Sequence, residues 1–242
     1  MKKTMHQRKK KIWLILILVL LLLAGCFFLY VQQYYHAEES ARSALVSDEI
    51  VTVARTENGW LFDGPSQRDA LIFYPGGKVE ETAYAPLLHL LAREGMDAFL
   101  VKMPFRLAVF GADRANALID QYEYENWYIG GHSLGGAMAA NYAAGHAEQL
   151  AGVILLAAYP TKRIEKDMMG ITIYGSEDGI LNPDKLKKGD QYMPEHSVKY
   201  VIEGGNHAQF GNYGKQKGDG EASVSDVKQQ QETVEIILQN TS

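Results

Sequence analysis

Short apolar runs alternate with longer amphipathic segments from about residue 50 to the C-terminus. Six runs are continuous and apolar up to a turn, which predicts buried strands: 70–77, 97–104, 126–136, 151–160, 171–179 and 198–207. Four segments have apolar residues at helical spacing: 82–95, 107–122, 137–146 and 225–238. Strands that alternate with helices in this way indicate an α/β domain, whose mostly parallel twisted sheet has helices on both faces.

The two ends of this domain have simpler patterns. Residues 49–56 alternate with period two, and residues 60–62 could pair with them as a hairpin. In the last helix, one face would carry Val227, Gln231, Val234 and Leu238, and we expect that face to close the domain.

An uncharged, strongly apolar segment spans residues 12–31, and six Lys or Arg residues precede it. Twenty helical residues reach about 30 Å, which is enough to cross a bilayer core. Basic residues 1–11 would stay in the cytoplasm, so the rest of the chain would face outward. Two alternatives remain: a cleaved secretory signal, and a lipoprotein signal, because LAGC at 23–26 resembles a bacterial lipobox that would lipidate Cys26.

Residues 32–49 are polar and lack a sustained apolar period, so they are expected to form a stalk before a catalytic domain at 50–242.

Of the 242 residues, 47% are hydrophobic and 22% are charged, as in globular proteins. Beyond residue 31 the chain has 18 basic and 29 acidic residues. The resulting net charge of −11 argues against nucleic-acid binding. The single cysteine excludes an internal disulfide and a cysteine-rich zinc site. No metal, organic cofactor or obligate protein partner is implied.

The sequence GHSLG at 131–135 fits the pattern G-x-S-x-G between a predicted strand and an Ala-rich helix. This pattern makes a sharp turn that exposes a serine hydroxyl, here that of Ser133. A serine needs a base, and the base needs an orienting acid; in this arrangement they follow in the order acid, then histidine.

Asp178 and His207 fulfil that order, each just after a predicted strand. Glu177 is a rival acid one residue earlier, whereas Asp184 and Asp219 lie further from a strand end. The other histidines lie in the N-terminal segments, within or at the end of helices, next to the serine, or before the last strand. The backbone N–H groups of Leu134 and of Gly77 or Lys78 are the expected donors to an oxyanion.

With these motifs in place, the chain resembles the α/β-hydrolase superfamily, and more closely the bacterial "α/β hydrolase fold-5" group, which is similar in outline to dienelactone hydrolases. The residues that carry the resemblance are YPGGKVE (74–80), VKMPFRLAVF (101–110), GGHSLGGAMAA (130–140), YGSEDG (174–179) and GGNHAQFGNYG (204–214). The resemblance implies Ser133 as nucleophile, Asp178 as acid, His207 as base, and Gly77 with Leu134 as oxyanion donors.

The predicted function is therefore a membrane-anchored, extracytoplasmic serine hydrolase that acts on small carboxylic esters. Only about ten residues separate two strands where many such enzymes insert a cap, so the site is expected to be open. Phe210 and Tyr213 are candidate wall residues for the substrate, or else simply part of the loop after His207. Acyl transfer to an envelope acceptor, or a non-catalytic envelope binding protein on the same fold, are the alternatives.

Overall fold

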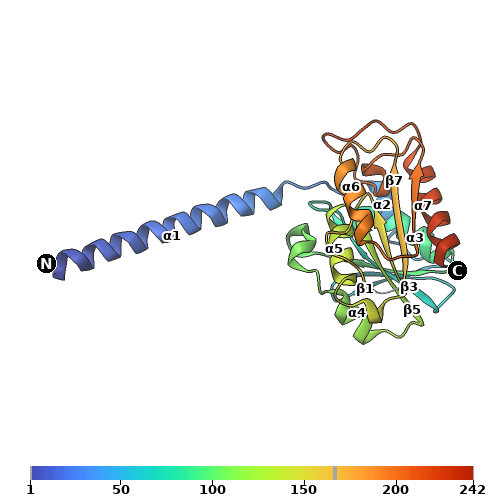
Figure 1. The fold of residues 1–242 in the computed structure, drawn as a ribbon, viewed down its shortest axis with the longest axis horizontal. Helices are drawn as coiled ribbons and strands as arrows, with labels where there is room; N and C mark the ends of the chain where they lie inside the picture. The colour runs from blue at the N-terminus through green and yellow to red at the C-terminus, as the bar shows by residue number, and fades with distance from the viewer. Residues whose placement is uncertain (1, 166–167, 242) are drawn as a thin grey trace. The chain divides into compact units, whose positions relative to one another are not determined.

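The computed structural model describes residues 2–165 and 168–241 (Figure 1). The chain forms two units, one up to Tyr34 and one from Tyr35 onward. The first unit is the helix α1 (Lys2–Gln32), in which Lys10–Gln32 has a mean hydropathy of 3.1. This helix is long and apolar enough to cross a membrane, and a signal sequence near an N-terminus has the same character.

The second unit is built on one eight-stranded sheet. Its strands are β1 (Thr52–Thr56), β2 (Gly59–Asp63), β3 (Asp69–Tyr74), β4 (Asp97–Val101), β5 (Asn126–His132), β6 (Gly152–Leu156), β7 (Met169–Gly175) and β8 (Ser197–Ile202). The spatial order is β1-β2-β4-β3-β5-β6-β7-β8. The expected hairpin is present as the antiparallel pair β1–β2, β2 also pairs antiparallel with β4, and all the other pairs are parallel. The mostly parallel α/β sheet is confirmed.

Helices cover both faces of this sheet (Figure 1). The short α2 (Glu39–Ser43), α3 (Ala85–Arg93) and α7 (Asp226–Thr241) share one core with Leu71 and Phe73 of β3. On the other face, α4 (Ala115–Gln121) and α5 (Leu134–Ala143) pack on Ile72 and Tyr74 of the same strand. Successive residues of a strand point to opposite faces, so the continuous apolar run of β3 is what a sheet buried on both sides requires.

Within the described residues, the connections contain one further helix and six short 3-10 turns. The helix is α6 (Pro183–Gly189), and the turns are η1 (Glu81–Tyr84), η2 (Pro104–Arg106), η3 (Ala108–Phe110), η4 (Ala147–Gln149), η5 (Asp190–Tyr192) and η6 (Ala208–Phe210). The expected long helix at 107–122 is wrong, because Gly111 separates η3 from α4. The connection between β6 and β7 includes residues 166–167, so the expectation that it holds no cap falls partly outside the described residues.

The expected face of the last helix is right for its second half only. Val234 is 2% exposed in the core and Leu238 packs against that core. Val227 is 58% exposed and Gln231 is exposed, whereas the polar Gln229, Gln230 and Thr233 are buried. These side chains bond to backbone atoms: Gln229 to Asn206, Gln230 to Gln209, and Thr233 within the helix. Helix α7 therefore packs through hydrogen bonds to the loop after β8 as well as through apolar contacts.

The expected stalk is largely part of the compact unit, which begins at Tyr35 rather than at residue 50. Tyr35 forms a parallel bridge with Val79, in which its N–H donates to Lys78 O at 2.8 Å. Further on, Glu38 N donates to Asn212 O at 2.9 Å, and Ala41 is fully buried. These contacts are with residues far along the chain, so the local polar composition of this segment did not reveal them.

Candidate active site

Ser133 lies at a sharp turn between β5 and α5. Its φ of 53° and ψ of −121° are in a region that non-glycine residues rarely adopt, at a cost of roughly 1–3 kcal/mol. The flanking glycines make the turn possible, because a Cβ on Gly135 would lie 2.1 Å from Tyr74 O and one on Gly131 would lie 2.4 Å from the same atom. The turn therefore packs directly against the carboxyl end of β3, as a G-x-S-x-G elbow requires.

The structure brings Asp178 and His207 together. His207 Nδ1 lies 2.8 Å from Asp178 Oδ2, and both side chains are 2% exposed. The other carboxylate oxygen accepts the N–H groups of Ile180 at 2.9 Å and Leu181 at 2.7 Å. Because the carboxylate is held from both sides, it fixes the proton of the imidazole on Nδ1 and leaves Nε2 as an acceptor.

His207 and Ser133 line the same cleft, a cavity of about 300 Å³. His207 Nε2 is buried and has no hydrogen-bond partner among the described residues. The hydrogen bonds found in the described part of the chain do not include one between this nitrogen and Ser133 Oγ. Such bonds often tighten only when a substrate is bound, so a nucleophile and base sharing one cleft are compatible with catalysis.

The rival acids lie elsewhere. Glu177 is exposed, and its carboxylate accepts from Ser176 Oγ at 3.3 Å. Asp184 is exposed in the first turn of α6. Neither carboxylate bonds to His207 in the described structure. Asp219 accepts the backbone N–H of His207, whereas Asp178 bonds to the imidazole itself, so Asp178 is the acid that can orient the ring.

Two backbone N–H groups are available beside Ser133. A Cβ on Gly77 would lie 2.8 Å from Leu134 Cδ2, so the loop after β3 touches the start of α5. The neighbouring N–H groups are already engaged: that of Gly76 donates to Tyr84 Oη at 3.1 Å, and that of Lys78 donates to Arg106 O at 2.8 Å. Among the hydrogen bonds of residues 2–165 and 168–241, none uses the N–H of Gly77 or Leu134. Of the two expected contributors from this loop, the geometry favours Gly77 over Lys78.

A buried pair behind the elbow was not anticipated from the sequence. Tyr84 and His132 are almost fully buried, and Tyr84 Oη lies 2.8 Å from His132 Nδ1. Tyr84 Oη accepts the Gly76 N–H and keeps its own proton, which we assign to the bond with His132 Nδ1; in this assignment the proton of neutral His132 is on Nε2. Burial, followed by the proximity of His207, lowers the pKa of His132 well below its usual value. His132 is therefore a neutral ring that braces the loop of Gly76 and Gly77.

Asp219 holds the loops of Asp178 and His207 together. In the sequence, the only sign of this is an Asp-Gly pair in a Gly-rich loop. Its Oδ1 accepts the N–H groups of Gly179 at 3.1 Å, His207 at 3.2 Å and Gly220 at 2.9 Å, and its Oδ2 accepts that of Ala208 at 2.8 Å. A single carboxylate thus connects the loop of Asp178 to the loop of His207.

Phe210 and Tyr213 lie in the core and not in the cleft, which corrects their expected place in a substrate wall. Phe210 is fully buried, with its ring 5.6 Å from that of His132, and Tyr213 is 5% exposed against Tyr84 and Tyr35. The side chains that do line the cleft come mainly from the loops after β6 and β7: Ala157, Ala158, Tyr159, Ile180, Leu181, Asn182 and Lys185. The sequence of these loops mixes apolar and polar residues without a periodic pattern, so it had no signal that would have identified them.

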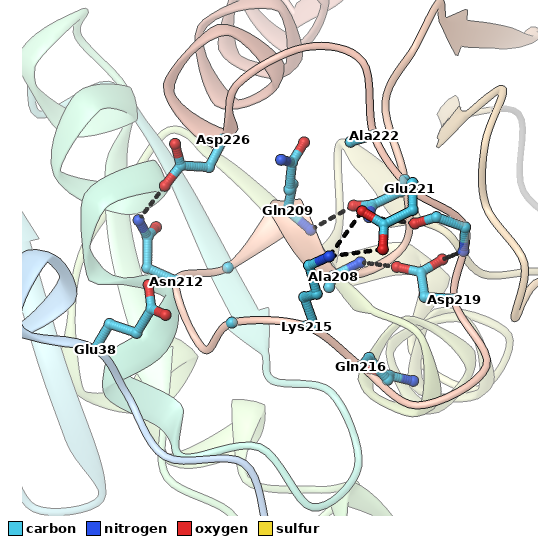
Figure 2. Close-up of a pocket in the computed structure, with 14 residues that line it drawn as sticks. Glu38, Ala208, Gln209, Asn212, Lys215, Gln216, Asp219, Glu221, Ala222 and Asp226 are labelled. Carbon is cyan, nitrogen blue, oxygen red and sulfur yellow. Dashed lines mark hydrogen bonds and ion pairs between the residues drawn. The ribbon is translucent and has the colours of Figure 1, made fainter.

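A second cavity of about 260 Å³ lies behind the histidine loop (Figure 2). Four carboxylates line it: Glu38, Asp219, Glu221 and Asp226. Asp219 is bonded to backbone N–H groups, Glu221 to Lys215, and Asp226 to Asn212. Within the described part of the chain, no group of three or more His, Cys, Asp or Glu side chains is arranged to hold a metal ion. The bonds of Asp219, Glu221 and Asp226 connect the segments on either side of this cavity.

Comparisons with known proteins agree with this fold. A model of the alpha/beta hydrolase family matches residues 70–232. TT1662 from Thermus thermophilus is 12% identical, covering 79% of this chain and 98% of that one, with a TM-score of 0.59. Carboxyl esterase 2 from Tuber melanosporum is 9% identical, with 87% and 92% covered and a TM-score of 0.58. A dienelactone hydrolase from Anabaena variabilis is 12% identical, with 81% and 99% covered and a TM-score of 0.57. A search of curated proteins finds no match.

Proposed function

Because the chain belongs to the alpha/beta hydrolase family, we propose that it is a serine hydrolase of small carboxylic esters that acts through a covalent acyl-enzyme. The observation that carries the proposal is the buried His207–Asp178 pair, which shares one cleft with a serine held in a strained turn. Strained backbone at a reactive side chain, together with a base oriented by an acid, is the arrangement that activates a hydroxyl.

In the first half of the reaction, Ser133 Oγ attacks the ester carbonyl carbon and His207 Nε2 takes the hydroxyl proton. Asp178 stabilises the resulting imidazolium, because it accepts the Nδ1–H. The N–H groups of Gly77 and Leu134 donate to the carbonyl oxygen as it becomes negative. The C–O bond to the leaving alcohol then breaks, and His207 gives its proton to that alcohol.

In the second half, water replaces the alcohol. His207 Nε2 takes a proton from water, the hydroxide attacks the acyl carbon, and the ester bond to Ser133 breaks as His207 returns the proton to Oγ. Both transition states use the same donors, so loss of one donor would slow both steps.

The cleft is small and partly apolar, which suits a short acyl group.

We further propose that α1 anchors the enzyme in a membrane, with the catalytic unit on the outer side. The apolar length of Lys10–Gln32 and the six preceding basic residues support this orientation. Lipidation of Cys26 is the competing form of attachment. Palmitate uptake by the wild type that is lost in Cys26→Ser would favour the lipoprotein, whereas no uptake favours the uncleaved helix.

The test of the activity is a panel of esters, thioesters and amides with the full chain, with Ser133→Ala as the blank. We expect ester turnover that disappears in the blank. Adding an alcohol or amine to the assay separates hydrolysis from acyl transfer, because transfer would give a new ester or amide product. Equal rates for wild type and Ser133→Ala would refute a serine mechanism.

A further inference from the structure

Three large apolar side chains lie exposed beside the cleft, on the turns η2 and η3. Phe105 is 52% exposed, Val109 is 50% exposed and Phe110 is 52% exposed. The rings of Phe105 and Phe110 are 5.6 Å apart in an edge-to-face arrangement, so these side chains form one surface. Isolated exposed apolar residues are common, but a cluster marks a surface that meets another apolar phase.

The backbone that presents this surface is unusual. Phe105 and Arg106 have φ values of 54° and 58°, two successive non-glycine residues in the left-handed region. Bulky residues rarely adopt this region, and the conformation is held by the N–H of Lys78, which donates to Arg106 O at 2.8 Å. Backbone strain of this kind clusters at functional segments, and here it belongs to the residues that present the exposed ring of Phe105.

The surface lies at the same edge of the sheet as the cleft. Strands β4 and β5 flank β3, and neighbouring strands are about 4.8 Å apart. The η2 turn follows β4, and Ser133 follows β5. Between them, the loop after β3 contacts Leu134 through Gly77 and contacts Arg106 through Lys78. Ile180, which lines the cleft and comes from the loop after β7, is also 36% exposed.

The chain enters the domain at this same edge. Tyr35 pairs with Val79, next to Lys78, and the apolar helix ends at Gln32. Three residues span at most roughly 11 Å when fully extended, whatever the direction of the helix. If the helix crosses a membrane, the tether therefore keeps this edge of the domain within reach of the bilayer surface.

We propose that Phe105, Val109 and Phe110 dock on the lipid bilayer and turn the cleft toward it. This inference rests on the proposed anchoring by α1, and it deepens the proposed function, since an ester dissolved in the bilayer would reach Ser133 without crossing bulk water. Aromatic and aliphatic side chains that enter the interface in this way bind in proportion to their apolar area.

The direct test uses the full chain in vesicles of phosphatidylethanolamine and phosphatidylglycerol. The chain has one cysteine, so a Cys26→Ser background allows one environment-sensitive dye to be placed at Phe110→Cys. The matched control is Val227→Cys on α7, an exposed apolar position at 58%. We expect a blue shift and quenching by spin-labelled lipid at position 110, and neither at position 227. Equal behaviour at the two positions overturns the proposal. A shift that lipid does not quench also overturns it, because it indicates a protein partner or a second copy.

The second arm measures activity with Phe105→Asn combined with Phe110→Asn. Asparagine tolerates positive φ, so the change removes apolar surface without straining the turn. We expect turnover of a bilayer-dissolved fluorogenic ester to fall by roughly tenfold. Turnover of a water-soluble ester and labelling of Ser133 by a fluorophosphonate should not change. An equal loss of turnover on both esters would contradict docking on the bilayer. If the fluorophosphonate fails to label the wild type, the hydrolase proposal is contradicted, but the dye experiment still tests docking.

Discussion

Two buried histidines lie next to each other at the carboxyl edge of the sheet, and they differ in one partner. Their ring centroids are 4.5 Å apart, and Nε2 of each lacks a hydrogen-bond partner among the described residues. His207 bonds to the carboxylate of Asp178, whereas His132 bonds to the phenol of Tyr84. A carboxylate stabilises the imidazolium, but a phenol that donates its proton to the ring opposes protonation.

This difference in partner explains why only one ring is expected to act as a base. His207 belongs to the cleft lining, and its Nδ1 proton points to a negative charge. His132 is absent from the residues that line the cleft, and burial keeps its pKa low. Proximity to the serine in the sequence is therefore a poor guide to the base: His132 adjoins Ser133, yet it serves the scaffold.

The largest effect on activity should come from neutralising the carboxylate that bonds to His207. Asp178→Asn removes the charge that stabilises the imidazolium and favours the wrong tautomer, so we expect kcat to fall by roughly 10⁴-fold. The matched control is Glu177→Gln, at the adjacent exposed carboxylate, which should retain wild-type kcat. Steady-state ester hydrolysis measures both, and a comparable loss in Glu177→Gln would mean that the acid is wrongly assigned.

The partner of His132 gives the next largest effect. Tyr84→Phe leaves the Gly76 N–H and His132 Nδ1 without their partner in a buried site, which should lower the free energy of unfolding by roughly 2–3 kcal/mol. Because the same bond positions the loop of Gly77, kcat should fall with little change in KM. Denaturant unfolding and kinetics would show this, and an unchanged stability would mean that the phenol does not bridge these groups.

The carboxylate of Asp219, which connects the loops of Asp178 and His207, should matter somewhat less because Asp219 is partly exposed. Asp219→Asn replaces one acceptor oxygen with a donor, and we expect a loss of roughly 2 kcal/mol in the free energy of unfolding. Glu221→Gln, two residues away in an exposed pair with Lys215, should change it by less than about 0.5 kcal/mol. Similar losses in the two variants would remove the special role of Asp219.

The smallest effect concerns pH and sharpens the contrast between the rings. Below pH 6.5, the usual pKa of histidine, the unfolded chain binds a proton on His132 that the folded chain does not bind, because its pKa is lowered in the fold. The free energy of unfolding therefore falls as pH falls below this value, by at most about 1.4 kcal/mol per pH unit. His132→Asn keeps an acceptor for Tyr84 and should flatten that slope. A slope equal to the wild type would mean that His132 is protonated in the fold.

The sequence was a good guide wherever the signal is local. Continuous apolar runs predicted the parallel strands, and the order of Ser133, Asp178 and His207 predicted side chains that the structure places at one edge of the sheet. Tertiary contacts account for what was missed. Residues 35–49 join the domain through bonds to residues 78–80 and 212, and the buried glutamines of α7 bond to a distant loop. Neither contact leaves a periodic pattern, and the same is true of the bonds made by Asp219.

Covalent labelling with a fluorophosphonate, mapped by mass spectrometry, tests the central claim most directly. The reagent reacts fastest with an activated serine hydroxyl, so the proposal predicts one main adduct, on Ser133, in the full chain. This adduct should be strongly reduced in Asp178→Asn and absent in Ser133→Ala. An unlabelled wild-type protein, or an adduct that persists in Ser133→Ala, would contradict the proposal that Ser133, His207 and Asp178 form a catalytic site.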